Sequence, residues 1–468
     1  MALKLFNTLS RLKEDFQPLN DRKVGLYTCG PTVYNYPHIG NYRAYIFGDI
    51  LKRYLTYSGY KVNHVMNLTD VDDKTIRESQ KAGKTLRDFT EFYSAEFFKD
   101  LKSLDIVPAD IYPKATEHVP EMISIINKLL DFGIAYKGED GSVYFNIKKF
   151  KNYGQLSNLK NDDLKEGASG RVKKDEYEKE NAQDFALWKA YDEADGDVFW
   201  DPSTWLGAGA KIGKGRPGWH IECSAMSMKY LGESFDLHTG GVDLVFPHHE
   251  NEIAQSEAAS GHPFVKYWLH NEWLLVDGKK MAKSAGNFYT LRNIMEKGFS
   301  PIAYRYLTLQ NHYRTPLNFT WVSLEAAQNA LNRLENIFLE LGDNPPTGGG
   351  KVNDEYKNKF AEAMDNDLET PAGLALVWDL LKETSIKPED KKATLLDFDK
   401  VLGLGLEKIK PVKIPTEVSK LAEERESARQ AGDFKKSDEL RDQIKKRGFE
   451  IKDTPDGYKL SKILKAII

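Results

Sequence analysis

Two apolar stretches near the start of the chain flank a segment with helical spacing. Residues 23–29 form a short apolar run that ends at a Gly-Pro pair, and residues 61–71 have a similar strand-like composition. Between them, residues 43–57 place apolar side chains at helical intervals. Together the three segments predict a β–α–β unit with parallel strands. The carboxyl ends of such strands share one edge of a sheet, where ligands bind, and we expect Cys29 and Thr69 at that edge.

The pattern changes twice further along the chain. From residue 116 to residue 215 it consists of short mixed segments with glycine-rich joints, as expected for an inserted domain. A strand-like run at 235–237 and a glycine-rich turn at 239–243 then resume the first pattern. Proline is well placed in the first turn of a helix, and we expect Pro247 to open a helix that runs to about Ser260.

Past Trp321 the pattern is almost wholly helical. One apolar stripe runs from Leu324 to Phe338, and Ser323 is the expected cap of that helix. A helical bundle is therefore predicted, and a linker at 408–415 leads to a small terminal unit.

Composition places the chain among soluble globular proteins and refines the picture of its last segment. The 468 residues are 41% hydrophobic and 12% aromatic, enough for several cores, and no apolar run approaches the roughly 20 residues of a membrane span. We expect a cytoplasmic protein. Residues 407–468 hold 16 Lys and Arg against 12 Asp and Glu, a local charge of +4, whereas the whole chain carries -4. A basic tail suits a polyanionic partner, although a solvated charged helical surface has the same pattern.

A candidate metal site emerges from the only two cysteines. His248 and Glu252 are four residues apart in the predicted helix and share one of its faces, but such pairs also arise by chance on solvated faces. Cys223 lies just upstream, and Cys29 ends the first predicted strand. Two thiolates, an imidazole and a carboxylate make a four-coordinate zinc set. The adjacent His249 is an alternative to His248 that spacing does not exclude.

Two further segments have the residues that phosphate groups require. In His38-Ile39-Gly40-Asn41 a glycine permits close backbone approach, and the following helix presents free N–H groups to an anion. Far downstream, residues 277–287 place several lysines on a glycine-flanked loop, where they could stabilise charge on a transferring phosphate group. Taken singly, the first segment has the pattern of an ordinary turn and the second that of an exposed basic turn.

In this order, and with an insertion between them, the two segments resemble the His-Ile-Gly-His and Lys-Met-Ser-Lys-Ser signatures of class I aminoacyl-tRNA synthetases. Within that class the chain resembles the cysteinyl-tRNA synthetase family from about residue 3 to 460. Four stretches carry the resemblance: 28–34 (TCGPTVY), 67–74 (NLTDVDDK), 216–226 (RPGWHIECSAM) and 246–252 (FPHHENE).

The resemblance implies an α/β fold with a Rossmann-type parallel catalytic sheet, an inserted connective domain, a helical bundle and a small mixed α/β terminal domain. The implied divisions are 1–115 and 216–260 for the two catalytic halves, 116–215 for the insertion, 261–320 for a linking fold with the lysine loop, 321–410 for the bundle, and 411–468 for a basic anticodon-binding module.

The resemblance also implies roles for individual residues. It gives the zinc-ligand role to Cys29, Cys223, His248 and Glu252, and so selects His248 over His249. The implied ATP-binding residues are His38, Gly40, Asn41, Gly241, Asp243, Lys280 and Lys283, of which His38, Lys280 and Lys283 are catalytic. The implied amino-acid pocket contains Thr69, Trp219 and His238.

Four features depart from the family pattern. Asn41 replaces the last histidine of the first signature and can still donate a hydrogen bond to the nucleotide, and Ala282 replaces the first serine of the second. Leu460 stands where many members have a tryptophan, which leaves an aromatic contact with tRNA open. The run 202–214 is longer than the usual connection.

The implied activity is the ATP-dependent, Mg²⁺-assisted formation of cysteinyl-adenylate and transfer of the cysteinyl group to the 3′ end of tRNA(Cys), by a monomer with one Zn²⁺ and no membrane partner. A hydrophobic pocket separates near-isosteres such as cysteine and serine by only about 10²-fold, whereas zinc strongly favours sulfur over oxygen. The alternatives are a cysteine:amino-sugar ligase with the same adenylation core and a catalytically silent paralogue that only binds RNA or other partners.

Overall fold

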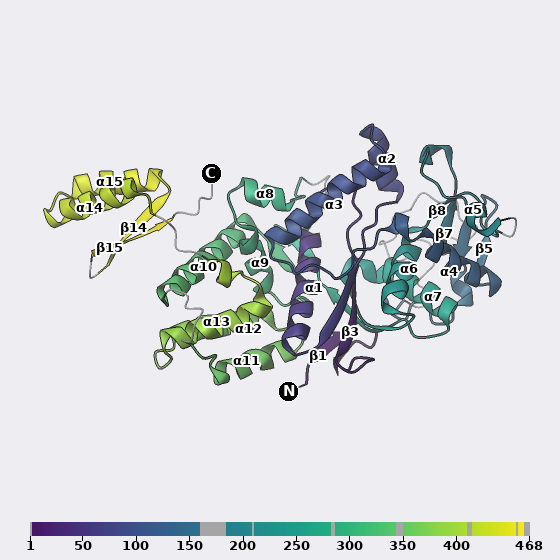
Figure 1. Ribbon diagram of the computed structural model, residues 1–468, viewed down its shortest axis with the longest axis horizontal. Coiled ribbons are helices and arrows are strands. Elements are labelled where there is room, and N and C mark those ends of the chain that lie inside the picture. Colours follow the sequence, from purple (N-terminus) through teal and green to yellow (C-terminus); the bar gives the residue numbers. More distant parts are fainter. Residues whose placement is uncertain are drawn as a thin grey trace.

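The computed structural model describes residues 2–159, 184–207, 210–281, 286–342, 350–409, 414–454 and 457–462. A parallel sheet occupies the middle of the elongated molecule, the inserted region lies at one end, and the C-terminal helices and hairpin lie at the other (Figure 1). None of the helices in these described ranges has the length and apolar character needed to cross a bilayer.

The central sheet confirms the predicted β–α–β unit and α/β class. Its four strands are parallel, in the order β10-β9-β3-β4. Strands β3 and β4 precede the insertion and β9 and β10 follow it, and β10 extends the sheet beyond residue 260. Their bounds are β3 (Lys23–Thr28), β4 (Lys61–Met66), β9 (Phe235–Gly241) and β10 (Val265–Asn271).

Strand β4 is shorter than the predicted 61–71 segment because its last residues leave the ladder. Asn67 turns its side-chain oxygen to the Gly30 N–H at 2.8 Å, and Thr69 pairs with Thr32 only as an isolated bridge. The loop after β4 thereby lies against the loop after β3, which places Thr69 near Cys29 at the carboxyl edge, as expected.

Helix α1 (Ile39–Tyr57) connects β3 to β4 and begins four residues before the predicted start. His38 and Asn41 form a reciprocal capping box that fixes this start: His38 Nδ1 accepts from the Asn41 N–H at 3.2 Å, and Asn41 Oδ1 accepts from the His38 N–H at 3.1 Å. Helices α2 (Asp73–Lys81) and α3 (Leu86–Ser103) follow β4 in the chain.

The inserted region forms its own antiparallel sheet. Asp73 at the start of α2 forms ion pairs with Lys189, at 2.6 Å, and with Arg216, and so connects the insertion to the catalytic region. The sheet has the order β5-β6-β7-β8. Its elements are α4 (Val119–Asp131), β5 (Ala135–Lys137), β6 (Val143–Phe145), β7 (Phe185–Ala190), α5 (Ser203–Leu206) and β8 (Gly215–Pro217).

Helical backbone begins at Pro247, as expected, and the regular α-helix after it begins at Glu250. Helix α6 (Trp219–Leu231) precedes β9, and an irregular turn, η6 (Val245–His249), separates β9 from α7 (Glu250–Ser260). Within η6 only Phe246 has a non-helical backbone, with φ -136° and ψ 131°, so the helical conformation starts after it, at Pro247, and continues through His249 into α7. The predicted end at Ser260 is confirmed.

A second small sheet carries the first part of the lysine segment. Strand β11 pairs in parallel with β13 and antiparallel with β12. These elements are β11 (Leu274–Val276), β12 (Lys279–Lys280), α8 (Leu291–Glu296), α9 (Pro301–Leu309) and β13 (Leu317–Phe319). At the start of the chain, β1 (Lys4–Asn7) and β2 (Leu12–Asp15) form a hairpin.

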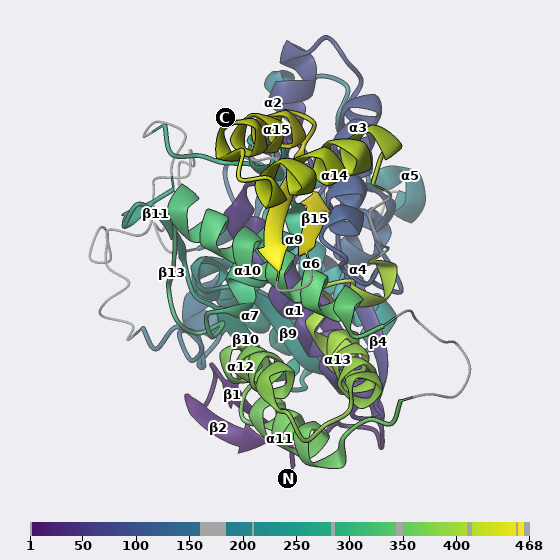
Figure 2. The ribbon, with the colours of Figure 1, turned by 90° about the vertical axis from the view of Figure 1, so that its left-hand side faces the viewer.

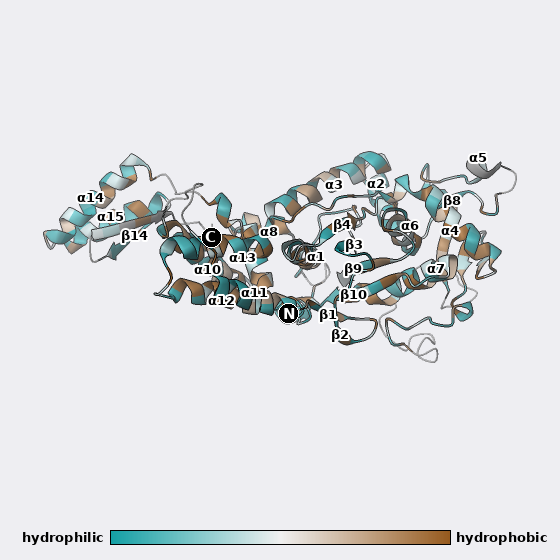
Figure 3. Cartoon of the chain, turned by 60° about the horizontal axis from the view of Figure 1, so that its bottom comes forward, coloured by the Kyte–Doolittle hydropathy of each residue, from teal (hydrophilic) through white to brown (hydrophobic). Residues whose placement is uncertain are grey.

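The predicted helical bundle is confirmed, and its helices alternate hydrophilic and hydrophobic segments (Figure 3). The expected cap of the first helix is wrong by three residues, because Thr320 caps it and Ser323 completes the capping box from inside. The bundle contains α10 (Trp321–Glu340), α11 (Asp354–Asp365), α12 (Thr370–Lys382) and α13 (Pro388–Leu402).

The C-terminal segment packs on itself as a small unit, which Figure 2 shows in front of the bundle. It consists of α14 (Thr416–Gln430), α15 (Phe434–Lys446), β14 (Phe449–Thr454) and β15 (Gly457–Lys462). Val418, Ala422, Ile444, Phe449 and Ile451 form its core, and Leu460 packs against them. We call residues 414–462 the terminal module.

Candidate active site

The structure brings the four proposed zinc ligands together at the carboxyl edge of the sheet. Cys29 follows β3, Cys223 lies in α6, His248 in η6 and Glu252 in α7. One ligand atom from each lies within 4.8 Å of the others, and all four residues are buried. The two Sγ atoms are 3.9 Å apart, and His248 Nε2 lies 3.0 Å from Glu252 Oε1.

These residues fit a zinc ion in number, chemistry and spacing. Two sulfurs, a nitrogen and an oxygen are a typical tetrahedral set. Zn–S bonds of about 2.3 Å in a tetrahedron place two sulfurs about 3.8 Å apart, close to the 3.9 Å between Cys29 and Cys223.

The cluster favours charged ligands at three of the four positions. The hydrogen bond from Cys29 lowers the pKa of Cys223 to about 6, whereas burial and the neighbouring Cys223 thiolate raise the pKa of Cys29. Burial alone would raise the pKa of Glu252, but His238 and His248 lower it to about 2. Burial opposes protonation of His248, yet Glu252 and Cys223 raise its pKa to about 10. Without a metal, a protonated imidazole thus balances the anionic ligands.

The second histidine of the pair also lies at the cluster. His249 Nε2 is 3.3 Å from Cys29 Sγ, and its Nδ1 is 2.8 Å from His270 Nε2. Cys29, His238, His249 and Glu252 form an overlapping four-residue set of the same compactness. Geometry alone therefore does not choose between the two histidines.

The proposed amino-acid pocket borders the cluster through side-chain contacts. The Trp219 ring stacks on His248 with centroids 4.2 Å apart, His238 Nε2 lies 3.0 Å from Glu252 Oε2, and Thr69 Oγ1 donates to Glu222 Oε2 at 2.9 Å. All three predicted pocket residues thus lie one contact from a proposed ligand or its neighbour in sequence.

Sequence reasoning missed three polar residues beside the cluster: His220, Glu222 and His270. His220 Nδ1 is 2.9 Å from His248 Nδ1, and burial together with the Cys223 thiolate raises the pKa of Glu222. The position of His220 and Glu222 in the same short motif as Cys223 was the available signal. Nothing local to His270 points to the site.

The structure also brings the two nucleotide segments together. The N–H of Ile39 donates to the Tyr289 carbonyl at 2.9 Å, and His38 pairs with Thr290 as an isolated bridge. A Cβ at residue 40 would lie 3.0 Å from the His38 ring and 3.4 Å from Met281 Cε. Glycine at this position therefore lets the His38 ring and Met281 lie close to the backbone of α1. Because His38 Nδ1 accepts a hydrogen bond, its proton belongs on Nε2.

The lysine segment is described only in part. Lys280 is exposed, with its Nζ 4.2 Å from the centroid of the Trp273 ring. Burial raises the pKa of Asp243, and the positive charge of Lys280 opposes that rise. Lys280 is therefore close enough to act on Asp243, a residue of the predicted ATP site. Gly241 ends β9 two residues earlier. Lys283 and Ala282 lie outside the described residues.

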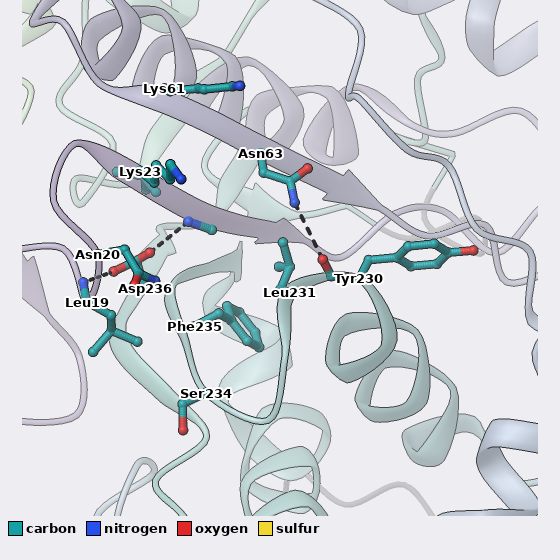
Figure 4. Close-up of a pocket in the computed structure, with 12 residues that line it drawn as sticks. Leu19, Asn20, Lys23, Lys61, Asn63, Tyr230, Leu231, Ser234, Phe235 and Asp236 are labelled. Atoms are coloured by element: carbon teal, nitrogen blue, oxygen red, sulfur yellow. Dashed lines mark hydrogen bonds between the residues drawn. The ribbon is translucent and has the colours of Figure 1, made fainter.

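A separate cavity of about 210 Å³ lies at the opposite edge of the sheet (Figure 4). Lys23, Lys61 and Phe235, which line it, are the first residues of β3, β4 and β9. Asp236 accepts there from the N–H groups of Leu19 and Gly25. The cavity is therefore remote from the predicted chemistry.

Comparison with known proteins agrees with this geometry. The family described as "tRNA synthetases class I (C) catalytic domain" matches residues 15–329, and the DALR domain matches residues 359–407. The cysteine–tRNA ligase of Brachyspira hyodysenteriae is 49% identical over 97% of this chain and 98% of its own, and that of Chlamydia muridarum is 48% identical over 99% and 100%. This chain belongs to the cysteine–tRNA ligase family. The cysteine–tRNA ligase of Chlamydia abortus is likewise 49% identical, over 98% of this chain and 98% of its own.

Solved structures support the same fold for this family member. The Mycobacterium tuberculosis methionyl-tRNA synthetase bound to methionyl-adenylate matches with a TM-score of 0.54 and 14% identity, covering 82% of this chain and 90% of its own. The leucyl-tRNA synthetase of an Agrobacterium radiobacter ternary complex matches with a TM-score of 0.56 and 11% identity, covering 84% and 85%. At these identities the likeness concerns the class I fold alone.

Proposed function

We propose that this chain joins L-cysteine to the 3′ end of tRNA(Cys) in two steps, through cysteinyl-adenylate formed from ATP and Mg²⁺. The observation that carries the proposal is the buried Cys29–Cys223–His248–Glu252 cluster at the sheet edge that also holds the nucleotide segments. Membership of the cysteine–tRNA ligase family over nearly the whole chain supports tRNA as the acceptor and gives no support to an amino-sugar acceptor.

The four residues of the cluster would hold one Zn²⁺. Bound there, the ion would supply a soft Lewis acid that takes up the thiolate of cysteine in preference to the hydroxyl of serine. The protein's own part is to exclude water and to orient the ligands: Trp219 covers His248, while His238 and His220 contact Glu252 and His248. This selectivity requires no separate editing domain.

The nucleotide segments would act on the phosphate groups. The substrate carboxylate attacks the α-phosphorus of ATP, and pyrophosphate leaves. His38 is suited to donate from Nε2 to a phosphate oxygen, because its Nδ1 is occupied by the Asn41 N–H. We assign Lys283 to charge on the α-phosphate and Lys280 to the departing pyrophosphate. Gly40, Asn41, Gly241 and Asp243 complete the proposed ATP site.

The basic C-terminal region 411–468, which includes the terminal module, would bind the anticodon end of the tRNA. Its exposed cations lie mainly on α15, at Lys435, Lys436, Lys445 and Lys446. Arg425, another cation of the module, is only 1% exposed and bidentate with Asp453, at 2.7 and 3.2 Å. We assign it to the module's internal structure.

The test is cysteine-dependent exchange of labelled pyrophosphate into ATP, with serine as the control substrate and with protein before and after metal removal. Exchange that requires cysteine and metal establishes the first half-reaction. Absence of exchange in the metal-loaded protein contradicts the enzyme proposal and favours the RNA-binding paralogue. Charging of a tRNA(Cys) transcript, compared with an amino-sugar acceptor, tests the second step.

The proposal also includes a monomer that works in the cytoplasm, where ATP, cysteine and tRNA meet. Light scattering across a concentration series tests the monomer. A mass that doubles with concentration, together with activity that follows the dimer, would contradict it.

A further inference from the structure

Two four-residue sets in the described part of the chain share one thiol and one carboxylate. Cys29 and Glu252 belong both to the proposed zinc set and to the set completed by His238 and His249. The two oxygens of Glu252 face different histidines: Oε1 lies 3.0 Å from His248 Nε2, and Oε2 lies 3.0 Å from His238 Nε2. Oε1 also lies 3.9 Å from His249 Nε2, so the carboxylate faces members of both sets.

Cys29 likewise faces one member of each set. Its Sγ is 3.9 Å from Cys223 Sγ in the first set and 3.3 Å from His249 Nε2 in the second. A thiolate and a carboxylate that each face two partners are the usual bridging groups between neighbouring cations, and two-metal sites in proteins have ions about 3.5–4 Å apart.

His249 is held in the orientation that a metal ligand needs. Its Nδ1 contacts His270 Nε2 at 2.8 Å, and His270 Nδ1 contacts Thr8 Oγ1 at 2.8 Å, which leaves Nε2 directed at Cys29. Such contacts at the remote nitrogen commonly fix the ring of a ligating histidine. Strand β9 leaves room for this ring, because a Cβ at Gly240 would lie 2.7 Å from His249 Cε1.

We propose that the centre takes up a second thiophilic divalent cation, Zn²⁺ or Cd²⁺ in excess, on Cys29, His238, His249 and Glu252, with Cys29 and Glu252 bridging the two ions. The inference rests on the proposed function, because it assumes that the first set holds its own ion. The second ion binds more weakly than the first. The first ion already draws on the charge of both shared ligands, and the second set adds only neutral imidazoles.

The simpler alternative is that His238 and His249 only orient the ligands of a single ion. Metal content distinguishes the two cases. The full-length protein is dialysed against buffers with limiting and then excess free Cd²⁺, and bound metal is measured by mass spectrometry. We expect about one ion per chain at limiting metal and about two at excess. X-ray absorption on the doubly loaded protein should show a metal–metal distance of about 3.5–4 Å.

Variants locate the second ion. His249→Gln should retain the first ion and lose the second. His118→Gln is the matched control, because it removes a buried histidine that contacts Lys114 and Tyr230 away from the centre, and it should still bind both ions. If His249→Gln fails to fold, His270→Gln tests the same ion indirectly, and its affinity for the second ion should fall about tenfold.

The outcomes separate this inference from the proposed function. One ion at every concentration, a second ion that His249→Gln retains, or a doubly loaded protein without a short metal–metal distance would overturn the second site and leave the zinc proposal intact. A wild-type protein that binds no metal at all would overturn both.

Discussion

Asp49 and Arg305 form a fully buried ion pair, with 2.6 Å between the aspartate Oδ2 and the guanidinium nitrogen. Asp49 lies in α1, which begins at the first nucleotide segment, and Arg305 lies in α9, which follows the second. Arg305 also donates to the carbonyls of Leu402 at 2.8 Å and Leu104 at 3.2 Å. One side chain thus joins the catalytic helix to the last helix of the bundle.

Arg305→Met should destabilise the protein by about 3 kcal/mol, because it leaves the Asp49 carboxylate buried with only Arg53 as a charged partner. Denaturant unfolding measures the change. Arg87→Met is the control, since Arg87 pairs with Glu91 on an exposed helix face and its loss should leave the free energy of unfolding almost unchanged. Equal costs for the two variants would contradict a structural role for the buried pair.

His64 should make the fold sensitive to mild acid. Burial lowers its pKa to about 3; Lys52 lowers it further, and Asp110 and Asp49 oppose the shift. The unfolded chain binds a proton below about pH 6.5 that the folded chain refuses, so stability falls as the pH drops from about 6.5 towards 3. Between pH 7.5 and 5 this one group should remove about 2 kcal/mol.

The His64 effect is isolated by subtraction. When the pH falls from 7.5 to 5, the free energy of unfolding should decrease by about 2 kcal/mol less in His64→Gln than in wild type, as measured by urea unfolding. His262→Gln, which removes an exposed histidine, is the control. If the free energy of unfolding depends on pH in the same way in wild type and His64→Gln, His64 binds its proton in the folded chain as readily as in the unfolded chain, and the prediction is wrong.

Thr69→Val should raise KM for cysteine about tenfold and change kcat by less than about threefold, because a lost hydrogen bond to a buried carboxyl costs about 1–1.5 kcal/mol. The variant removes the hydroxyl that donates to Glu222 at 2.9 Å. Thr69→Ser keeps the hydroxyl and should stay near wild type. Steady-state pyrophosphate exchange provides both constants, and a fall in kcat alone would place Thr69 in the chemical step instead.

Arg425 and Lys445 should behave differently although both are cations of the terminal module. Arg425→Met leaves Asp453 with only its more exposed partners Arg429 and Arg441, so residues 414–462 should become sensitive to limited proteolysis. Lys445→Met should leave the module intact and reduce the salt slope of tRNA binding by about one. An intact module in Arg425→Met with a reduced salt slope would reassign that arginine to phosphate contact.

The sequence was sufficient where the determinants are local. Apolar runs and helical periodicity located β3, α1 and the bundle, and the identities of Cys29 and Cys223 pointed to a metal cluster. The helix start at Pro247 was predicted too, because a proline in the first turn is a local signal, and the extended Phe246 lies just before it.

Long-range partners account for the remaining differences. The burial of Arg425 does not follow from its local sequence, because its partner Asp453 lies 28 residues away on another element. Helical spacing would direct His248 and His249 to different faces, yet the irregular turn η6 brings both to the same cluster. Lys283, the other proposed lysine of the signature, lies outside the described residues.

The strand order also determines how long β3 and Cys29 wait for their partners during synthesis. Cys29 and Cys223 are 194 positions apart, and β3 lies between β4 and β9 in the sheet. A chain that leaves the ribosome at about 5–20 residues per second therefore carries an unpaired strand edge and a free thiol for about 10–40 s before the second half of the centre arrives. During that interval the edge of β3 and the Cys29 thiol stay accessible, and a pause in translation within the insertion would prolong the exposure.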